Sequence, residues 1–593
     1  MKTKSFRGAA LAASAVMGCV GAALAAVAQA PLLTTSSAVP PNLMFTLDDS
    51  GSMYFECLPD ALCVSGGNRV GTIPGGTTGA GGLKSGVASY GSVFGARMRA
   101  AAINPLYYNP GTRYQPWLQA DNTRKAQYPG TAAPVDPRNP GGATMNLAVA
   151  ATMSLSWCDA ANACTTAARS FYPAQYFNLN TGAAGIALSD FTEVTIQSGG
   201  SYPKAPTRTD CAGPTSCSYA EEMQNFSNWY TYARSRMLVA IGGTSEAFSD
   251  VPTNYRVGYG TINTVNQAVD DFATNTVARG VRPFSGLDRD DFYTRLQTAV
   301  PNGGTPLRRA MNDVGQYFSR VDKKGPWSDT PGTLSARADL SCRRSFHLLM
   351  TDGVWNGDGA STVEATADVD STSGPLITGP DGQSFQYSPT KPYAGDGGNT
   401  LADIAMHYWS RDLHGGLENG VAASAANPAF WQHMVNYTIA FGVNGNLANP
   451  GDLPALTAGS KTWGMPVADA GAVNVDDLWH AAINSRGKSL SATNSAEYAA
   501  AVKSMLDDIA ARSSSEAGVA VSGLAGTAAT RKYVPGYSTD KWSGELSAVK
   551  LVDGSTAWKA STMLPAPTSR NIYTFATSIP YRRPASCYFT HCE

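Results

Sequence analysis

The stretch Leu43-Met44-Phe45-Thr46-Leu47-Asp48-Asp49-Ser50-Gly51-Ser52 joins a short apolar run to a turn of small polar residues. The run has the length and composition of a strand that is buried on both faces. In open parallel sheets, ligands bind beyond the carboxyl ends of the strands. Asp48, Ser50 and Ser52 alternate along the turn, which allows three oxygen donors to face one point. A lone Asp-x-Ser-x-Ser is usually an ordinary turn, so a site requires further donors elsewhere in the chain.

Strands and helices alternate along the chain. Besides Leu43–Leu47, apolar runs predict strands at Tyr255–Ile262, Phe346–Thr351 and Val435–Val443. Helices are predicted at Tyr219–Ile241, at Pro306–Val321 with Thr305 as N-cap, at Leu401–Leu413, and from a capping box of Asn494 and Glu497 to about Arg512. Such alternation predicts an α/β fold, doubly wound, with a mostly parallel sheet covered on both faces.

Two later positions supply the missing donors. Thr305, in Gly303-Gly304-Thr305-Pro306, opens a predicted helix, and Asp352 directly follows the strand Phe346–Thr351. Together with Asp48, Ser50 and Ser52, these residues form a predicted metal site. A set made only of oxygen atoms suits a hard divalent cation, and we expect Mg²⁺, with Mn²⁺ or Ca²⁺ as alternatives. Such a site leaves coordination positions open, so a partner carboxylate can complete the shell of the ion.

The first residues predict export. Lys2, Lys4 and Arg7 precede an apolar run from Gly8 to Val27 that is rich in small residues, as in a secretory signal peptide of residues 1–28. The run is just long enough to span a bilayer, which makes an uncleaved anchor the alternative. The net charge is −1 and no basic run occurs, so we expect no nucleic-acid partner.

Cysteine spacing agrees with an oxidising compartment. Six cysteines fall into three pairs of equal spacing, and three local disulfides are the simplest pairing among fifteen: Cys57/Cys63, Cys158/Cys164 and Cys211/Cys217. Zinc binding is the alternative, but the spacing differs from that of paired zinc knuckles. Cys342 has no local mate, and a buried free thiol is expected there.

Two insertions interrupt the α/β pattern, at about residues 54–218 and 355–398. The first holds all three cysteine pairs and is predicted to be a disulfide-pinned subdomain. Its aromatic segment Asn104–Trp117 is interpreted as core rather than as an adhesive surface, and His480 is interpreted as a packing histidine rather than a metal ligand. Residues 530–593 contain short strands that suit the start of a truncated β-propeller, since some 60 residues cannot bury a stable core alone.

The five predicted ligands match the metal-ion-dependent adhesion site of von Willebrand factor A domains. From about residue 40 to 575, the chain resembles the PilY-type tip-associated adhesins of type IV pili. This resemblance rests on an ordered set of segments: Asn104–Pro110, Glu222–Phe226, Arg234–Leu238, Met350–Gly357, Asn399–Ala405, Trp431–Met434 and Asp476–Ala482. It implies an A-type domain at 40–515 that precedes a C-terminal β-propeller with a calcium loop.

The resemblance also implies a function. Members of this family act in pilus assembly, counter retraction, and support adhesion at the pilus tip, the outer membrane or the cell surface after passage through the periplasm. The implied partners are pilins or minor pilins and host or surface ligands that offer a carboxylate, and peripheral association with the outer membrane is compatible with this picture. Because little of the propeller is present, we do not expect functions that depend on it, such as calcium-controlled retraction.

We predict no enzymatic activity. The six histidines form no His-Glu-x-x-His pattern, and no Gly-x-Ser-x-Gly elbow surrounds a serine. Asp48 and Asp49 are adjacent and are expected to point apart, which argues against an acid/base pair. Two alternatives stay open: a secreted metal-binding A-domain protein unrelated to pili, and a hydrolase that uses the ion to activate water.

Overall fold

The computed structural model describes residues 39–74, 84–335, 338–357, 367–513, 520–521, 531–538, 543–550, 555–565 and 569. The predicted signal peptide and the predicted strand at Asn571–Thr577 lie outside these residues. The chain divides into a large unit, residues 39–515 with 537–544, and a small unit that includes residues 516–536 and 545–593. The predicted site lies entirely within the large unit.

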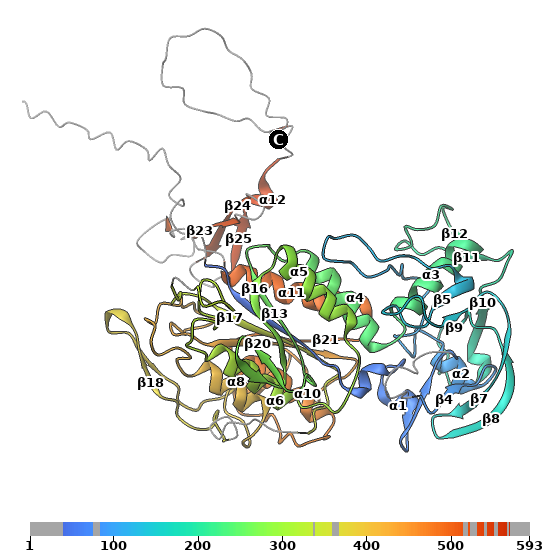
Figure 1. Ribbon diagram of the computed structural model, residues 1–593, viewed down its shortest axis with the longest axis horizontal. Coiled ribbons are helices and arrows are strands. Elements are labelled where there is room, and N and C mark those ends of the chain that lie inside the picture. The colour runs from blue at the N-terminus through green and yellow to red at the C-terminus, as the bar shows by residue number, and fades with distance from the viewer. Residues whose placement is uncertain are drawn as a thin grey trace, which may run out of the picture. The chain divides into compact units, whose positions relative to one another are not determined.

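A six-stranded sheet is the framework of the large unit, in the order β16-β13-β1-β17-β20-β21 (Figure 1). Its strands are β1 Asn42–Leu47, β13 Arg256–Thr261, β16 Val277–Pro283, β17 Ser345–Thr351, β20 Met434–Phe441 and β21 Ser489–Ala492. All neighbours are parallel except β16, which runs antiparallel to β13. All four predicted strands are therefore present, and β1 lies between β13 and β17.

Helices cover both faces of this sheet. Leu43, Phe45 and Leu47 of β1 share one core with α4, α5 and α11, whereas Met44 faces a second core with α6, α8 and α10. These helices are α4 Arg236–Ser249, α5 Gly286–Thr298, α11 Ser495–Ser513, α6 Leu307–Phe318, α8 Leu401–Trp409 and α10 Ala472–Asn484. Because alternate side chains of β1 enter opposite cores, every residue of the strand is buried. The predicted doubly wound α/β arrangement is confirmed.

Two helix predictions were wrong: one predicted helix is broken in its middle, and another has a different N-cap residue. The helix predicted at Tyr219–Ile241 is broken into α3, Tyr219–Tyr232, and α4, which begins at Arg236. Ser235 causes a new start, because its side chain accepts a hydrogen bond from the main-chain N–H of Leu238. Thr305 does not cap α6, since Pro306 holds the N-cap position and makes no side-chain capping bond.

The helices α8 and α11 are capped in different ways. Thr400 and Asp403 form a complete capping box at the start of α8. At α11, the Oδ1 of Asn494 accepts the Glu497 N–H at 3.0 Å, but the Glu497 carboxylate accepts from Thr493 instead of Asn494. The helix α11 therefore starts where it was predicted to start, but the carboxylate of Glu497 has a different hydrogen-bond partner.

The first insertion forms a subdomain with its own cores. Its main sheet has the order β2-β3-β4-β7-β8 and is joined by short two-stranded ladders. Tyr107 and Tyr108 are fully buried and Trp117 nearly so, which confirms that the aromatic segment is core. Its elements are η1 Gly51–Tyr54, α1 Asp60–Cys63, β2 Val64–Ser65, β3 Asn68–Gly71, β4 Gly86–Ala88, α2 Val93–Met98, η2 Gly130–Ala132, β5 Ala133–Pro134, β6 Thr144–Met145, β7 Ala151–Ala160, β8 Ala163–Phe171, β9 Gln175–Leu179, η3 Leu188–Asp190, β10 Phe191–Thr195, β11 Ser201–Pro203 and β12 Ser216–Ser218.

All three predicted disulfides are present, Cys57–Cys63, Cys158–Cys164 and Cys211–Cys217. The first closes a loop that contains α1, the second joins β7 to β8, and the third precedes α3. Cys342 is free but exposed, so the expectation of a buried thiol was wrong. It lies in the turn before β17, where the chain comes to the surface ahead of the sheet.

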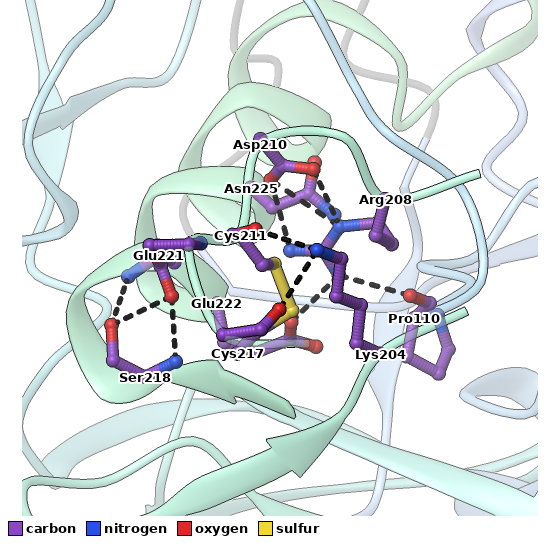
Figure 2. The surroundings of a disulfide bond; sticks show 12 residues. Pro110, Lys204, Arg208, Asp210, Cys211, Cys217, Ser218, Glu221, Glu222 and Asn225 are labelled. Atoms are coloured by element: carbon purple, nitrogen blue, oxygen red, sulfur yellow. Dashed lines mark hydrogen bonds and ion pairs between the residues drawn. A yellow bond between two sulfur atoms is a disulfide. The ribbon is translucent and has the colours of Figure 1, made fainter. Parts of the chain in front are cut away.

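A buried ion pair lies beside the third disulfide (Figure 2). The guanidinium of Arg208 contacts the carboxylate of Glu222 on α3 at 2.7 Å, and both side chains are completely buried. Arg208 also contacts Asp210 at 3.0 Å, and Lys204 donates to the carbonyl of Cys211 at 2.7 Å. These contacts fasten the disulfide loop to α3, whose other end leads directly to α4 and the sheet.

The remaining elements are short. In the described part of the second insertion, β18 Leu376–Thr378 pairs with β19 Ser384–Gln386, next to η4 Pro380–Gly382. Residues 520–563 contribute a four-stranded sheet and a short helix, β22 Ala520–Val521, β23 Arg531–Ser538, β24 Ser543–Lys550, β25 Thr556–Lys559 and α12 Ala560–Met563. Elsewhere lie β14 Gln267–Val269, β15 Phe272–Thr274 and α9 Leu453–Thr457. No helix within the described ranges is long and apolar enough to cross a membrane.

Candidate metal centre

The turn after β1 brings its polar groups together at the carboxyl edge of the sheet. Asp48 is completely buried, and its Oδ1 accepts the Ser50 N–H at 2.7 Å. The hydroxyls of Ser50 and Ser52 lie 3.0 Å apart. The main-chain N–H of Asp48 donates to the carbonyl of Met350 at 2.9 Å, so the turn begins as a continuation of the β1–β17 ladder.

Asp352 enters the same region from the end of β17. Its neighbour Thr351 donates a 2.6 Å hydrogen bond to the Oδ2 of Asp48, which orients that carboxylate. Burial, and then the negative charge of Asp352, raise the pKa of Asp48 to about 7. Burial raises the pKa of Asp352 as well, whereas the Arg236 guanidinium and the Ser52 hydroxyl oppose the rise. Two mutually repelling carboxylates are thus buried side by side.

Thr305 lies in the loop that borders this turn. The carbonyl of Gly303 accepts the Gly51 N–H at 3.1 Å, and Thr305 is buried. The side chain of Asn356 accepts the Thr305 N–H at 2.8 Å, while the Asn356 N–H donates to the Thr305 carbonyl at 2.9 Å. The loop is therefore held between the Asp48–Ser52 turn and the segment that follows Asp352.

Asp49 points away from Asp48, as expected. Its Oδ1 accepts the Asn263 N–H at 2.9 Å, next to β13, whereas Asp48 contacts Thr351 of β17. The Asn263 amide in turn donates to the carbonyls of Asn302 and Gly304, each at 2.7 Å. Asp49 therefore secures the loop that carries Thr305 and is not part of the donor cluster.

Sequence reasoning missed Arg236, the first residue of α4. Its side chain is completely buried, and its Nη1 donates to the Asp352 Oδ2 at 3.0 Å. Its Nη2 donates to the carbonyl of Cys57 at 3.0 Å and also contacts Asp60 of α1. Arg236 lies in the segment Arg234–Leu238 that carries part of the family resemblance, but the continuous helix predicted there hid its position at a helix start.

A divalent cation fits this donor set. Asp48, Asp352, Ser50 and Ser52 offer oxygen atoms only, which are the ligands preferred by Mg²⁺, Mn²⁺ and Ca²⁺. Two buried carboxylates close to each other are costly unless a positive charge compensates them. Arg236 contacts one oxygen of Asp352 and compensates part of this negative charge.

A second acidic group lies apart from this centre. Carboxylate oxygens of Asp368, Asp370 and Asp403 lie within 4.8 Å of one another. The protein itself satisfies much of this group: Asp403 accepts the Val369 N–H at 2.8 Å, and Asp370 accepts the Gly395 N–H at 2.8 Å. His480 is buried beside Asp370, and its Nε2 lies 2.6 Å from the Tyr393 carbonyl, as in a histidine that packs with its polar atom satisfied. These contacts give the group a structural role in joining the second insertion to α8 and α10.

Sequence comparison identifies relatives of this chain among known proteins. It is 30% identical to the type IV pilus biogenesis factor PilY1 of Pseudomonas aeruginosa strain PAK over 593 residues, which is 92% of this chain. The chain belongs to the PilY-type family. The corresponding proteins of strains PAO1 and UCBPP-PA14 are 30% and 29% identical, and they are matched over 92% and 93% of this chain. The chain spans about half of these relatives, 46% of each.

Other comparisons add little to this assignment. No family model matches the chain. The pilus adhesin SpaC of Lactobacillus rhamnosus GG, in its open conformation, is similar over 51% of this chain and 34% of its own, at 10% identity and a TM-score of 0.25. A likeness at that level supports no argument about fold or function. The PilY-type assignment therefore rests on the sequence matches alone.

Proposed function

We propose that this PilY-type protein is exported, acts in type IV pilus biogenesis and adhesion, and binds partners through a divalent cation held at the carboxyl edge of its sheet. The observation that supports the proposal is the hydrogen-bonded turn of Asp48, Ser50 and Ser52 beside the β17 end that carries Asp352, in a relative of pilus biogenesis factors. Pilins or minor pilins and surface ligands that offer a carboxylate are the proposed partners. We propose no enzymatic role.

The sheet supports an A-type domain of the von Willebrand factor class as the scaffold. An open, mostly parallel sheet has its ligand-binding crevice at the carboxyl ends of adjacent strands. Here β1 and β17 are adjacent, with Leu47 opposite Met350, and they end in Asp48 and Asp352. We propose that residues 40–515 form this domain with its two insertions, and that residues 530–593 begin a propeller.

In the proposed mechanism, Asp48 and Asp352 would hold the ion with the help of the Ser50, Ser52 and Thr305 hydroxyls. Thr351 and the Ser50 N–H fix the orientation of Asp48, while Asn356 fixes the Thr305 loop. When bound, the ion supplies an electrophilic centre that accepts a carboxylate from a partner. Mg²⁺ is the proposed ion, because hydroxyl and carboxylate donors with retained waters suit it.

Isothermal titration of the full mature chain with Mg²⁺, Mn²⁺ and Ca²⁺ tests the ion, with Asp48→Ala and Asp352→Ala alongside. Saturable binding to the wild type that both variants lose is expected. Pilus counts and twitching in the source bacterium, after deletion of the gene and return of wild type or Asp48→Ala, test the biological role. Normal pili and twitching in the deletion strain would favour a secreted metal-binding protein unrelated to pili.

A further inference from the structure

Arg236 connects the candidate metal centre to the first disulfide loop. Its guanidinium contacts Asp352 at 3.0 Å on one side and Asp60 of α1 on the other. The same group donates to the Cys57 carbonyl and lies 5.0 Å from the ring centroid of Phe55. Asp60 belongs to the loop that the Cys57–Cys63 disulfide closes, so the insertion and the sheet share one buried cation.

The two carboxylates that share Arg236 differ in their surroundings. The side chain of Asp352 is 5% exposed, whereas that of Asp60 is 50% exposed and reaches solvent. Asp352 directly follows Thr351, whose hydroxyl donates to the Oδ2 of Asp48 at 2.6 Å. The guanidinium donates to the Oδ2 of Asp352 at 3.0 Å, so this carboxylate already shares its negative charge with one cation. An arginine keeps its charge at any physiological pH, so this positive charge is permanent.

We propose that Arg236 is a built-in counter-cation of this metal centre, which shares Asp352 with the bound ion and sets how tightly that ion is held. This inference rests on the proposed function. Two carboxylates, one guanidinium and one divalent ion leave a net positive charge at the loaded site. That charge weakens the hold on the ion and favours an anionic ligand, which is the chemistry of a partner carboxylate.

Asp60 tunes this effect from outside the donor cluster. Its negative charge offsets the guanidinium, so the loaded site carries less excess positive charge while Asp60 is in contact. Loss of Asp60 would leave the full charge of Arg236 directed at Asp352 and at the ion. A contact made by the half-exposed Asp60 side chain would in this way change the affinity for the ion, although Asp60 is not one of the proposed ligands.

This arrangement predicts opposite signs for two substitutions. Arg236→Gln removes the repelling charge while keeping a hydrogen-bond donor near Asp352, so Mg²⁺ binding should tighten at least about tenfold. Asp60→Asn removes the offset, so Mg²⁺ binding should weaken by about three- to tenfold, a smaller effect because Asp60 is half-exposed. If Arg236 and Asp60 had only structural roles, both substitutions would weaken Mg²⁺ binding.

The experiment is titration of the full mature chain with Mg²⁺ and Mn²⁺, with thermal melting to check folding. Asp60→Asn should have little effect in the Arg236→Gln background, because no guanidinium charge is left there for Asp60 to offset. Asp250→Asn, at the far end of the same helix and exposed, is the matched control and should not change the affinity.

The outcomes separate this inference from the proposal beneath it. No ion binding by the wild type would overturn the metal centre and the inference with it. Binding by the wild type, with Arg236→Gln and Asp60→Asn shifted in the same direction or not at all, would overturn the inference alone. If Arg236→Gln does not fold, Asp60→Asn still decides, because an unchanged affinity in that variant contradicts the role of Arg236.

Discussion

The hydroxyl of Thr351 donates a 2.6 Å hydrogen bond to the Oδ2 of Asp48. The two residues lie at the ends of adjacent parallel strands, 303 positions apart in the chain. Both are completely buried, and the same hydroxyl also accepts the Gly353 N–H at 3.0 Å. One side chain thus orients the first acidic ligand and shapes the turn that carries the second.

We predict that Thr351→Val weakens Mg²⁺ binding by about ten- to a hundredfold, since removal of a partner that orients a ligand typically costs this much. The substitution keeps the shape of the side chain and deletes only the hydroxyl. Isothermal titration measures the effect, and Thr351→Ser, which keeps the hydroxyl, is the control. Equal affinities in all three proteins would contradict an orienting role.

We predict that the ion-free protein loses stability as the pH rises from 4 to 7. The pKa of Asp48 is raised from 3.8 to about 7 in the folded state, so the folded chain binds this proton more tightly than the unfolded chain does. The free energy of unfolding therefore falls across this window, by on the order of a few kcal/mol from this group.

Asp48→Asn removes the titrating carboxyl group. The free energy of unfolding of this variant should therefore fall less between pH 4 and pH 7 than that of the wild type. Melting temperatures in the presence of a chelator, for wild type and variant at several pH values between 4 and 8, measure the difference. Burial also raises the pKa of Asp370 and of Asp477 to about 7, so only the difference between the two proteins reports on Asp48. If the melting temperatures of the two proteins change in parallel with pH, Asp48 does not cause the loss of stability.

We predict that Cys342 reacts with a thiol reagent in the native protein and that the six paired cysteines do not. Cys342 is free and exposed, whereas Cys57, Cys158 and Cys217 are completely buried in disulfides. Labelling without denaturant, followed by peptide mapping without reduction, checks both statements. Label on any of the six paired cysteines would contradict the pairing.

We predict that Glu222→Gln destabilises the first insertion by about 3–5 kcal/mol, because it leaves the fully buried Arg208 without its charged partner on α3. Chemical denaturation followed by tryptophan fluorescence measures the loss. The double variant Arg208→Met with Glu222→Leu is the control and should recover much of it, since paired replacement of buried ions by apolar residues is often neutral. A single variant as stable as wild type would show that the pair contributes little.

Patterns along the sequence were enough to predict the strands, the doubly wound class and the local disulfides, and to propose the residues of the candidate centre. These features are set by neighbours along the chain: apolar runs mark buried strands, and a six-residue spacing limits which cysteines meet. Asp48 and Asp352 could be grouped in advance, because adjacent parallel strands end at the same edge of a sheet.

The groups that surround those residues could not be predicted, because they come from elements far apart in the chain. Arg236 reaches Asp352 because α3 ends at Tyr232 and a new helix begins after Ser235, a break that helical periodicity does not reveal. Asp60 reaches Arg236 because the Cys57–Cys63 loop folds back over the sheet edge. Contacts across 116 and 176 positions depend on packing between elements, which no local pattern encodes, and they set the charge at the centre.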